Sequence, residues 1–180
     1  EKYFRSGVLK HVSRRVVWLF VLILAATISG KILQKYTVTL SSIIALAYFI
    51  PMLTGAGGNI GSQSSTLVIR AMATGELMLS QWLKVLWREA CAGFLLGLTL
   101  GGTAFIVAIV FLRDIKLGIT VGVSVATVVL VGNIGGATAP LIFRYFRIDP
   151  AMVSAPLITT ILDVTGIIIY FEIAKRILNI

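Results

Sequence analysis

Long apolar runs constrain this chain more than any other feature of its sequence. A run of about 20 mostly apolar residues is long enough to cross the hydrocarbon core of a bilayer. Charged residues make up only 13% of the chain, against about 25% in a soluble domain, so water could not wet its whole surface. The sequence therefore predicts an all-α integral membrane protein with five transmembrane helices. The five runs cover residues 16–33, 40 to the glycine-rich segment 55–61, 90–112, 117–143 and 150–173.

The basic residues predict how the chain is oriented. The segment before the first span is too charged for a cleavable signal peptide, which has a short apolar core. With the N-terminus in the cytoplasm, ten Lys and Arg residues fall on the inner side and six on the outer side, the bias expected of membrane proteins. The net charge of +9 is therefore explained by topology and lipid contact rather than by nucleic-acid binding. We expect a multi-pass protein of the cell membrane with a cytoplasmic N-terminus and an external C-terminus.

One segment of the second span recurs 74 residues later. GNIGSQSSTLVIR, residues 58–70, and GNIGGATAPLIFR, residues 132–144, are identical at six of thirteen positions. The same offset relates Glu89 to Asp163. Spans two and three and spans four and five are therefore predicted to be two copies of one helical pair, a kind of repeat known in transporters. A chance match is the alternative.

The glycine-rich segment is predicted to interrupt the second span at residues 51–61. Pro51 lacks an amide hydrogen and kinks a helix, and four glycines follow it: Gly55, Gly57, Gly58 and Gly61. Carbonyl groups freed by such a break must face protein or a water-filled cavity, and transporters present them to cations there. The alternative is close helix packing through small residues, which we favour for Gly93, Gly97 and Gly101. Packing alone does not account for the polar residues beside the first group: Asn59, Ser62, Gln63, Ser64, Ser65 and Thr66.

Asp163 is the most unusual residue within the spans. It lies 13 residues after Pro150, about 20 Å along a helix and so near the bilayer centre. Charged side chains at this depth are costly and are retained for ion pathways, proton relays or buried pairs. No basic residue is predicted at the same depth, which favours a bound cation or a water-filled pore. Glu89, at the edge of span three, could mark the cytosolic entrance of that pathway or be a solvated interfacial residue.

The oxygen-bearing residues of the spans suit a hard cation. Asp163, Asn59 and Asn133, with Ser and Thr hydroxyls, favour magnesium or calcium over copper or zinc. One carboxylate compensates a dication poorly, whereas a two-fold dimer with Asp163 of both chains at its axis would supply two. Magnesium releases its waters reluctantly, so a wide polar pore fits it better than a tight cage.

Two long motifs resemble one known family. PMLTGAGGNIGSQSSTLVIRAMATGEL, residues 51–77, and DPAMVSAPLITTILDVTG, residues 149–166, are similar to the transmembrane domain of the MgtE magnesium transporters and their animal solute-carrier relatives. The resemblance implies a homodimeric magnesium channel of five helices per chain. Its pore would lie at the dimer axis, lined by spans two and five, and Asp163 would be the pore aspartate that holds hydrated magnesium. The pore-lining residues that we expect are Gly55, Gly57, Gly58, Asn59, Asn133, Ala155 and Thr159.

The resemblance also implies a domain organisation. Members of the family normally carry cytosolic domains before the membrane domain: a helical domain and a pair of CBS domains, joined to it by a long helix that senses magnesium. We expect residues 1–13 to be the remnant of that connecting helix and residues 14–180 to form the transmembrane pore domain. Magnesium-dependent closure is therefore in doubt for this chain.

Three other functions are open. A membrane enzyme could use Asp163 and Glu89 as an acid–base pair, but the sequence has no nucleophile–base arrangement and no metal-ligand trio, so we do not expect an enzyme. A structural subunit could use the glycines and Asp163 for assembly alone. A carrier coupled to protons or sodium is the nearest rival. We expect no cofactor other than the transported ion, and the sequence does not select among magnesium, manganese, cobalt and calcium.

Overall fold

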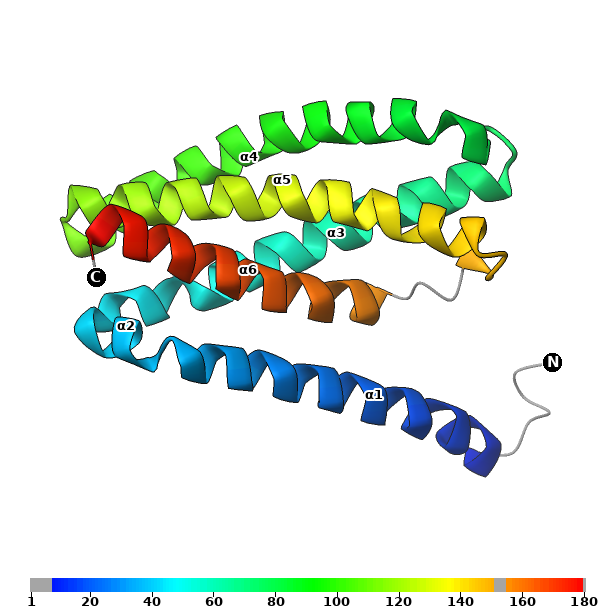
Figure 1. The fold of residues 1–180 in the computed structure, drawn as a ribbon, viewed down its shortest axis with the longest axis horizontal. Coiled ribbons are helices and arrows are strands. Elements are labelled where there is room, and N and C mark those ends of the chain that lie inside the picture. Colours follow the sequence, from blue (N-terminus) through cyan, green and yellow to red (C-terminus); the bar gives the residue numbers. More distant parts are fainter. Residues whose placement is uncertain (1–7, 151–154, 180) are drawn as a thin grey trace.

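The computed structural model describes residues 8–150 and 155–179. The helices follow one another in the order shown in Figure 1. Within the described residues, four helical stretches are long and apolar enough to cross a membrane: Ile44–Ala73, Leu79–Leu112, Ile115–Tyr145 and Ala155–Leu178. The elements are α1 (Val8–Lys35), α2 (Thr37–Ser42), the 3₁₀-helix η2 (Ile44–Phe49), α3 (Ile50–Ala73), the 3₁₀-helix η3 (Leu79–Gln81), α4 (Trp82–Leu112), α5 (Ile115–Tyr145) and α6 (Ala155–Leu178).

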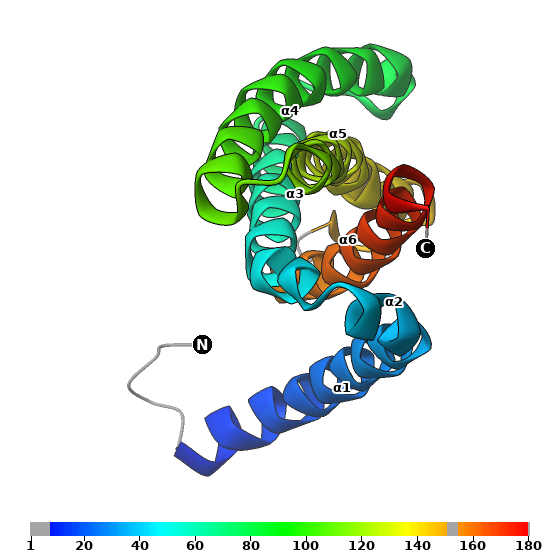
Figure 2. The same cartoon turned by 90° about the vertical axis from the view of Figure 1, so that its left-hand side faces the viewer.

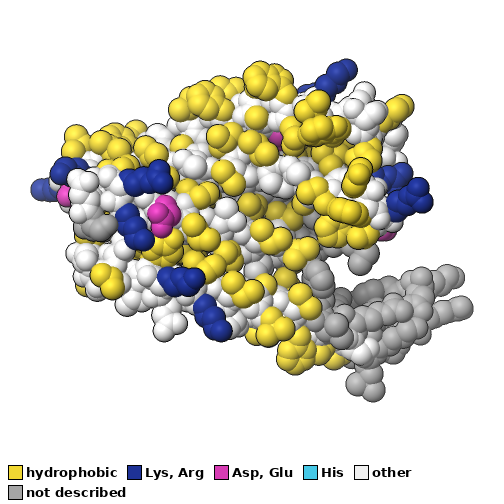
Figure 3. All heavy atoms as spheres, viewed as in Figure 1, with side chains coloured by type: hydrophobic (Ala, Val, Ile, Leu, Met, Phe, Trp, Pro, Cys, Tyr) yellow, Lys and Arg dark blue, Asp and Glu magenta, His cyan; other side chains and the backbone are white. Residues whose placement is uncertain are grey.

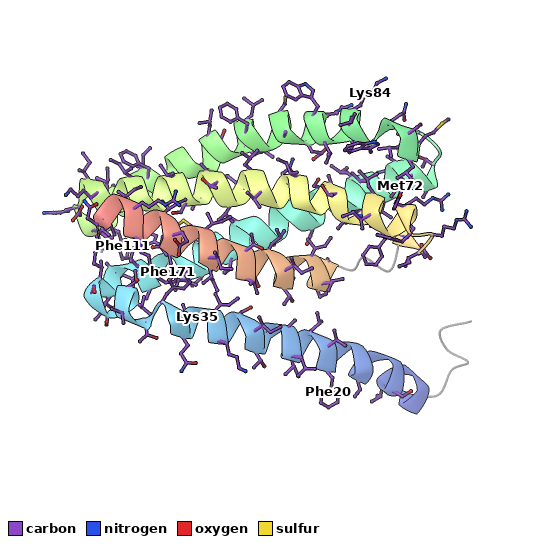
Figure 4. All side chains as sticks on the ribbon, in the orientation of Figure 1. Phe20, Lys35, Met72, Lys84, Phe111 and Phe171 are labelled. Carbon is purple, nitrogen blue, oxygen red and sulfur yellow. The ribbon has the colours of Figure 1, made fainter. Side chains whose placement is uncertain are left out.

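The all-helical architecture is confirmed, and the count of five spans stays a prediction. The first predicted span, residues 16–33, lies inside α1, a helix of 28 residues. Figure 2 shows α1 set apart from the group formed by α3 to α6. Large apolar side chains of α1 are accordingly exposed: Phe20 is 62% and Leu24 is 66% exposed. Figure 4 shows Phe20 pointing away from the other helices.

Basic side chains are unevenly distributed along the long axis of the molecule. On the face drawn in Figure 3, most Lys and Arg side chains lie toward the two ends, and apolar side chains cover much of the surface between them. The ends of α3 and α5 and the start of α4 lie at one end of this axis, and α2 and the turn between α4 and α5 lie at the other (Figure 1). A membrane across the middle would leave the basic side chains at the two headgroup layers.

The predicted interruption at residues 51–61 is wrong. α3 is an unbroken α-helix from Ile50 to Ala73, and Pro51 lies in its first turn, where the missing amide hydrogen has no helical partner to lose. The irregular backbone comes earlier, at Ile43 and in η2. One carbonyl of that segment is paired by another helix, since the hydroxyl of Tyr170 on α6 donates to the oxygen of Leu46 at 3.0 Å.

Glycines allow α3, α4 and α5 to approach closely. A Cβ atom on Gly132 would lie 2.9 Å from the carbonyl oxygen of Gly57, and one on Gly136 would overlap the carbonyl oxygen of Gly61. On the other side of α5, a Cβ atom on Gly101 would lie 2.6 Å from the oxygen of Gly122. Close packing therefore explains why residues 57 and 61 are glycines. It explains the glycines of the third predicted span, Gly93, Gly97 and Gly101, in the same way.

The apolar core is centred on α5, which lies between α3, α4 and α6 (Figure 2). Four of its valines are almost completely buried: Val121, Val125, Val128 and Val129. Tyr170 and Phe171 of α6 fill the core near η2, with exposures of 1% and 0%. These contacts fix the position of α6 against α3 and α5.

Tyr36 links the junction of α1 and α2 to the C-terminal half of α6. Its ring stacks on Phe171 with centroids 4.8 Å apart, and its hydroxyl donates to Glu172 Oε1 at 2.9 Å. Lys175 completes the cluster, with its Nζ 3.4 Å from Glu172 Oε1 and 4.7 Å from the centre of the Tyr36 ring. α1, which packs little elsewhere, is thereby attached to the rest of the protein.

Candidate functional site

Asp163 lies in the first half of α6, eight residues after Ala155, or about 12 Å along the helix. Its side chain is partly buried. Among residues 8–150 and 155–179, no hydrogen bond or ion pair to this carboxylate is found. A carboxylate at this depth without a partner among the described residues requires compensation from water, a cation or another molecule.

The start of α6 lies directly against the glycine-rich part of α3. A Cβ atom on Gly58 would lie 3.0 Å from Cγ2 of Thr159, and one on Gly61 would lie 3.1 Å from Cγ2 of Ile158. Asp163 follows Thr159 by one helical turn and so lies on the same side of α6. The structure thus brings together three residues predicted for the site: Gly58, Thr159 and Asp163.

A polar stripe on α3 is left uncovered by the other described residues. Gly55, Asn59, Gln63 and Thr66 recur at helical spacing, and all four are exposed. A shallow groove of about 430 Å³ follows the stripe and is lined by Ser62, Gln63, Thr66 and Leu67. Ala155, at the start of α6, is also exposed. Amide and hydroxyl groups within a span are costly to expose to lipid. We therefore expect this stripe to face water or a protein partner.

Two other predicted pore-lining residues lie in contacts between helices. Gly57 is buried, and a Cβ atom there would lie 2.7 Å from Cγ1 of Val128. Asn133 is only 4% exposed, and its side chain is hydrogen-bonded to Glu89. Neither residue belongs to the exposed stripe of α3.

Glu89 belongs to a polar cluster that joins three helices. Its Oε2 accepts hydrogen bonds from the hydroxyl of Ser64 on α3 and the amide of Asn133 on α5, both at 2.9 Å. The same Asn133 amide nitrogen donates to the backbone oxygen of Glu89 at 2.7 Å. We refer to these three residues as the Glu89 cluster. Sequence reasoning missed it, although polar residues at similar distances from the same end of three spans were a usable signal.

The residues around Asp163 offer oxygen atoms to a cation. In the described part of the chain, no three His, Cys, Asp or Glu side chains come together as a metal site. Thr159, one helical turn before Asp163, carries a hydroxyl group, and Asn59 on α3 follows Gly58, the residue that packs against Thr159. A carboxylate surrounded by neutral oxygens suits a hard cation that keeps its waters.

Comparison with known sequences agrees with this donor chemistry. Residues 50–173 match the sequence model of MgtE, described as a divalent cation transporter. The chain belongs to the MgtE family. The match includes nearly all of α3 to α6 and therefore Asp163, the polar stripe and the Glu89 cluster. The resemblance of the two motifs to MgtE is thereby confirmed.

Curated MgtE proteins align over almost the whole chain. It is 41% identical over 178 residues to the magnesium transporter MgtE of Thermus thermophilus, and the alignment covers 98% of this chain and 39% of that protein. It is 33% identical over 166 residues to the magnesium transporter MgtE of Bacillus subtilis, covering 92% of this chain and 37% of that protein. The chain thus spans about two fifths of the length of these MgtE relatives. Both are named as transporters, which is consistent with our expectation that the chain is not an enzyme.

Proposed function

We propose that this chain forms the ion-conducting membrane domain of an MgtE-type transporter and passes hydrated Mg²⁺. The observation that carries the proposal is the Asp163 carboxylate, partly buried on α6 and without a partner among the described residues. It lies beside the part of α3 that bears the exposed polar stripe. The names of the curated relatives support magnesium as the ion.

A homodimer would complete the site. A single carboxylate leaves one charge of a dication uncompensated, and charge is costly in a medium of low dielectric constant. A two-fold axis near α3 and α6 would bring together two copies of Asp163 and would cover both polar stripes. In this arrangement the pore-facing residues are Gly55, Asn59, Ala155, Thr159 and Asp163, whereas Gly57, Gly58 and Asn133 hold the pore helices in place.

Magnesium would pass with most of its water shell. Apart from Asp163, the proposed lining offers amide and hydroxyl oxygens, which can accept hydrogen bonds from the coordinated waters. Because Mg²⁺ dehydrates reluctantly, contacts through its waters bind it weakly enough for release. Selectivity against manganese, cobalt and calcium would then depend on the size of the hydrated ion.

Five spans with a cytoplasmic N-terminus follow from the same proposal. α1 is long enough to cross a bilayer, at 28 residues or about 42 Å. The end of α3, which carries Arg70, and the start of α4, which carries Lys84 and Arg88, lie at the same end of the molecule as the beginning of α1 (Figure 1), in agreement with a basic cytoplasmic side. Residues 1–7, most of the proposed connecting-helix remnant, lie outside the described residues, whereas residues 8–13 continue α1 toward the N-terminus.

The internal repeat is also part of the proposal. Residues 58–70 lie within α3 and residues 132–144 lie within α5, and both segments finish near the ends of their helices, at the same end of the molecule. Glu89 and Asp163, related by the same offset, lie on the helices that follow, α4 and α6. Of these two carboxylates, Glu89 alone has protein donors within the described part of the chain, which would leave Asp163 free for the ion.

Magnesium flux through the purified chain in liposomes tests the proposal. The parent should load vesicles with Mg²⁺ without an opposing proton or sodium gradient, and Asp163→Asn should lose most of this flux at unchanged thermal stability. Asp114→Asn is the matched control, because Asp114 caps α5 at the end of the molecule and Asn caps a helix equally well. Parent-level flux in Asp163→Asn would exclude Asp163 from the pathway, and flux that required an opposing gradient would indicate a coupled carrier.

A further inference from the structure

A second site lies at the end of the molecule where α3 ends and α4 begins. A cavity of about 550 Å³ is lined there by three cationic side chains, Arg70, Lys84 and Arg88. Within residues 8–150 and 155–179, none of the three has an ion-pair partner. The volume is that of a small-molecule site, about 300 to 1,000 Å³. Three unpaired cations around one cavity favour an anionic ligand.

Two carboxylates also line the cavity, Glu76 and Glu89. They reduce the positive charge of the lining without cancelling it, because three cations face two anions. Oε2 of Glu89 already accepts hydrogen bonds from Ser64 and Asn133. Glu76 is exposed in the turn after α3, where it can accept hydrogen bonds from hydroxyl groups of a ligand.

The rest of the lining is largely apolar. Leu67 and Val68 of α3, Leu77 of the turn and Val85 of α4 contribute to it, and Leu67 is 61% exposed. A small inorganic anion would make no use of these side chains. The lining therefore suits a molecule that carries both a negative charge and apolar carbon chains.

The residues around the cavity indicate its depth relative to a membrane. Beside it, the η3 turn and the first turns of α4 expose four large apolar side chains: Met78 at 65%, Trp82 at 47%, Leu83 at 62% and Trp87 at 74%. Tryptophan is enriched at the boundary between headgroups and acyl chains. Figure 4 shows Lys84 on α4 at the same end of the molecule as Met72 near the end of α3. The cavity thus opens at the level of lipid headgroups.

We propose that this cavity binds the headgroup of an anionic glycerophospholipid. Arg70 and Arg88 would hold the phosphate, since the guanidinium fork matches phosphate oxygens, and Lys84 would add a point charge. Glu76 would accept hydrogen bonds from the hydroxyls of a glycerol headgroup, and the acyl chains would run along Leu77 and Val85. Basic pockets between transmembrane helices bind such headgroups. The site is separate from Asp163, so it does not depend on the proposed ion pathway.

Quenching of tryptophan fluorescence by brominated lipids can test the site. Trp18→Phe leaves Trp82 and Trp87, both near the cavity, as the only reporters. Brominated phosphatidylglycerol and brominated phosphatidylcholine are titrated into the protein in neutral detergent. Neutralising Arg70, Lys84 and Arg88 to Gln should weaken phosphatidylglycerol binding roughly a hundredfold, about fivefold for each cation near a membrane surface. The matched control neutralises Lys31, Lys35 and Lys116 to Gln, which removes the same charge at the other end of the molecule.

Each outcome decides the assignment. The site is supported if the variant with Arg70, Lys84 and Arg88 replaced by Gln loses the preference for phosphatidylglycerol over phosphatidylcholine and the control variant keeps it. Arg70→Lys should also keep this preference. If the triple variant unfolds, Arg70→Gln and Arg88→Gln alone should each weaken binding about fivefold. Equal weakening in the control would reduce the effect to general charge attraction and overturn the proposal. Displacement of the lipid by glycerol 3-phosphate at the same concentration would show that the cavity binds a soluble phosphate compound instead. If the protein shows no preference between the two lipids, the cavity is not a site for anionic lipid, and a protein segment becomes the candidate ligand.

Discussion

The side-chain amide of Asn133 donates to two oxygens of Glu89, the backbone oxygen at 2.7 Å and Oε2 at 2.9 Å. Ser64 donates to the same Oε2 from a third helix. Asn133 is 4% and Ser64 is 2% exposed, so neither can turn to water for a substitute partner. This relationship makes Glu89 the acceptor on which two buried donors of α3 and α5 depend.

Replacement of Glu89 should therefore destabilise the protein in a graded way. Glu89→Ala removes the Oε2 acceptor of two buried donors and should cost about 1–3 kcal/mol of unfolding free energy. Glu89→Gln retains one acceptor oxygen and should cost clearly less. Unfolding in detergent, followed by circular dichroism, measures both. Equal losses for the two variants would contradict a role based on the acceptor.

The same pair of variants distinguishes the two predicted roles of Glu89. As part of the Glu89 cluster, it should tolerate Glu89→Gln with near-parent magnesium flux. A Glu89 that attracts ions at the cytosolic entrance would lose flux in the same variant, because its charge is gone although its shape is kept. Flux and stability measured on one preparation separate these outcomes.

Two adjacent glycines of α5 should respond oppositely to a methyl group. Gly136→Ala places a Cβ atom on the carbonyl oxygen of Gly61, whereas at Gly135 the nearest atom is Cδ2 of Leu162 at 3.7 Å. Overpacking typically costs about 1–3 kcal/mol, so Gly136→Ala should lower the melting temperature by several degrees and Gly135→Ala should leave it nearly unchanged. A similar loss in both variants would show that α3 and α5 can separate freely.

Gly55 offers a direct test of the exposed stripe of α3. A Cβ atom at Gly55 or at Gly102 of α4 would meet no atom within 4 Å, so Leu should fit both positions in the single chain. If the stripe lines the pore, Gly55→Leu should reduce magnesium flux at unchanged thermal stability, and Gly102→Leu should not. Gly58→Leu is a poorer test, because its side chain would also push Thr159 and separate α6 from α3.

Alkaline pH should weaken the attachment of α1. Burial raises the pKa of Tyr36 above its ordinary value, and the hydrogen bond to Glu172 and the charge of Glu172 raise it further. Because the folded state binds this proton more tightly, its contribution is complete below the ordinary pKa near 10 and is lost as pH rises through the folded pKa. Tyr36→Phe keeps the ring and removes the proton, so its stability should fall less steeply above about pH 10. Thermal unfolding of both proteins between pH 8 and 11 checks the difference, and parallel curves would refute it.

The apolar runs predicted the long helices well. The runs at residues 90–112 and 117–143 lie within α4 and α5, and each helix extends beyond its run where Trp, Lys and Arg are tolerated at headgroup level. The error at Pro51 has a definite cause. Proline and glycine disfavour a helix interior in water, but Pro51 lies in the first turn of α3 and the glycines are used for packing, which no local pattern reveals.

The candidate site was predictable where it depends on one unusual residue. Asp163 is conspicuous because an apolar run surrounds it, and it lies one helical turn from Thr159, which packs against Gly58. The part that these residues play in ion conduction stays a prediction. The hydrogen bonds of Glu89 were not predictable, because they depend on how α3, α4 and α5 cross. The cavity beside Arg70 likewise depends on the angle between α3 and α4, which the sequence does not specify.

The contact between Gly61 and Gly136 has a mechanical consequence for α3 and α5. Where two helices meet through main-chain atoms alone, no rotamer can change to absorb a shift between them. The two helices should therefore move as one rigid body. α6 meets α3 through the side chains of Thr159 and Ile158, which do have alternative rotamers. A change in the distance between Asp163 and α3 should therefore come from movement of α6 against the pair formed by α3 and α5.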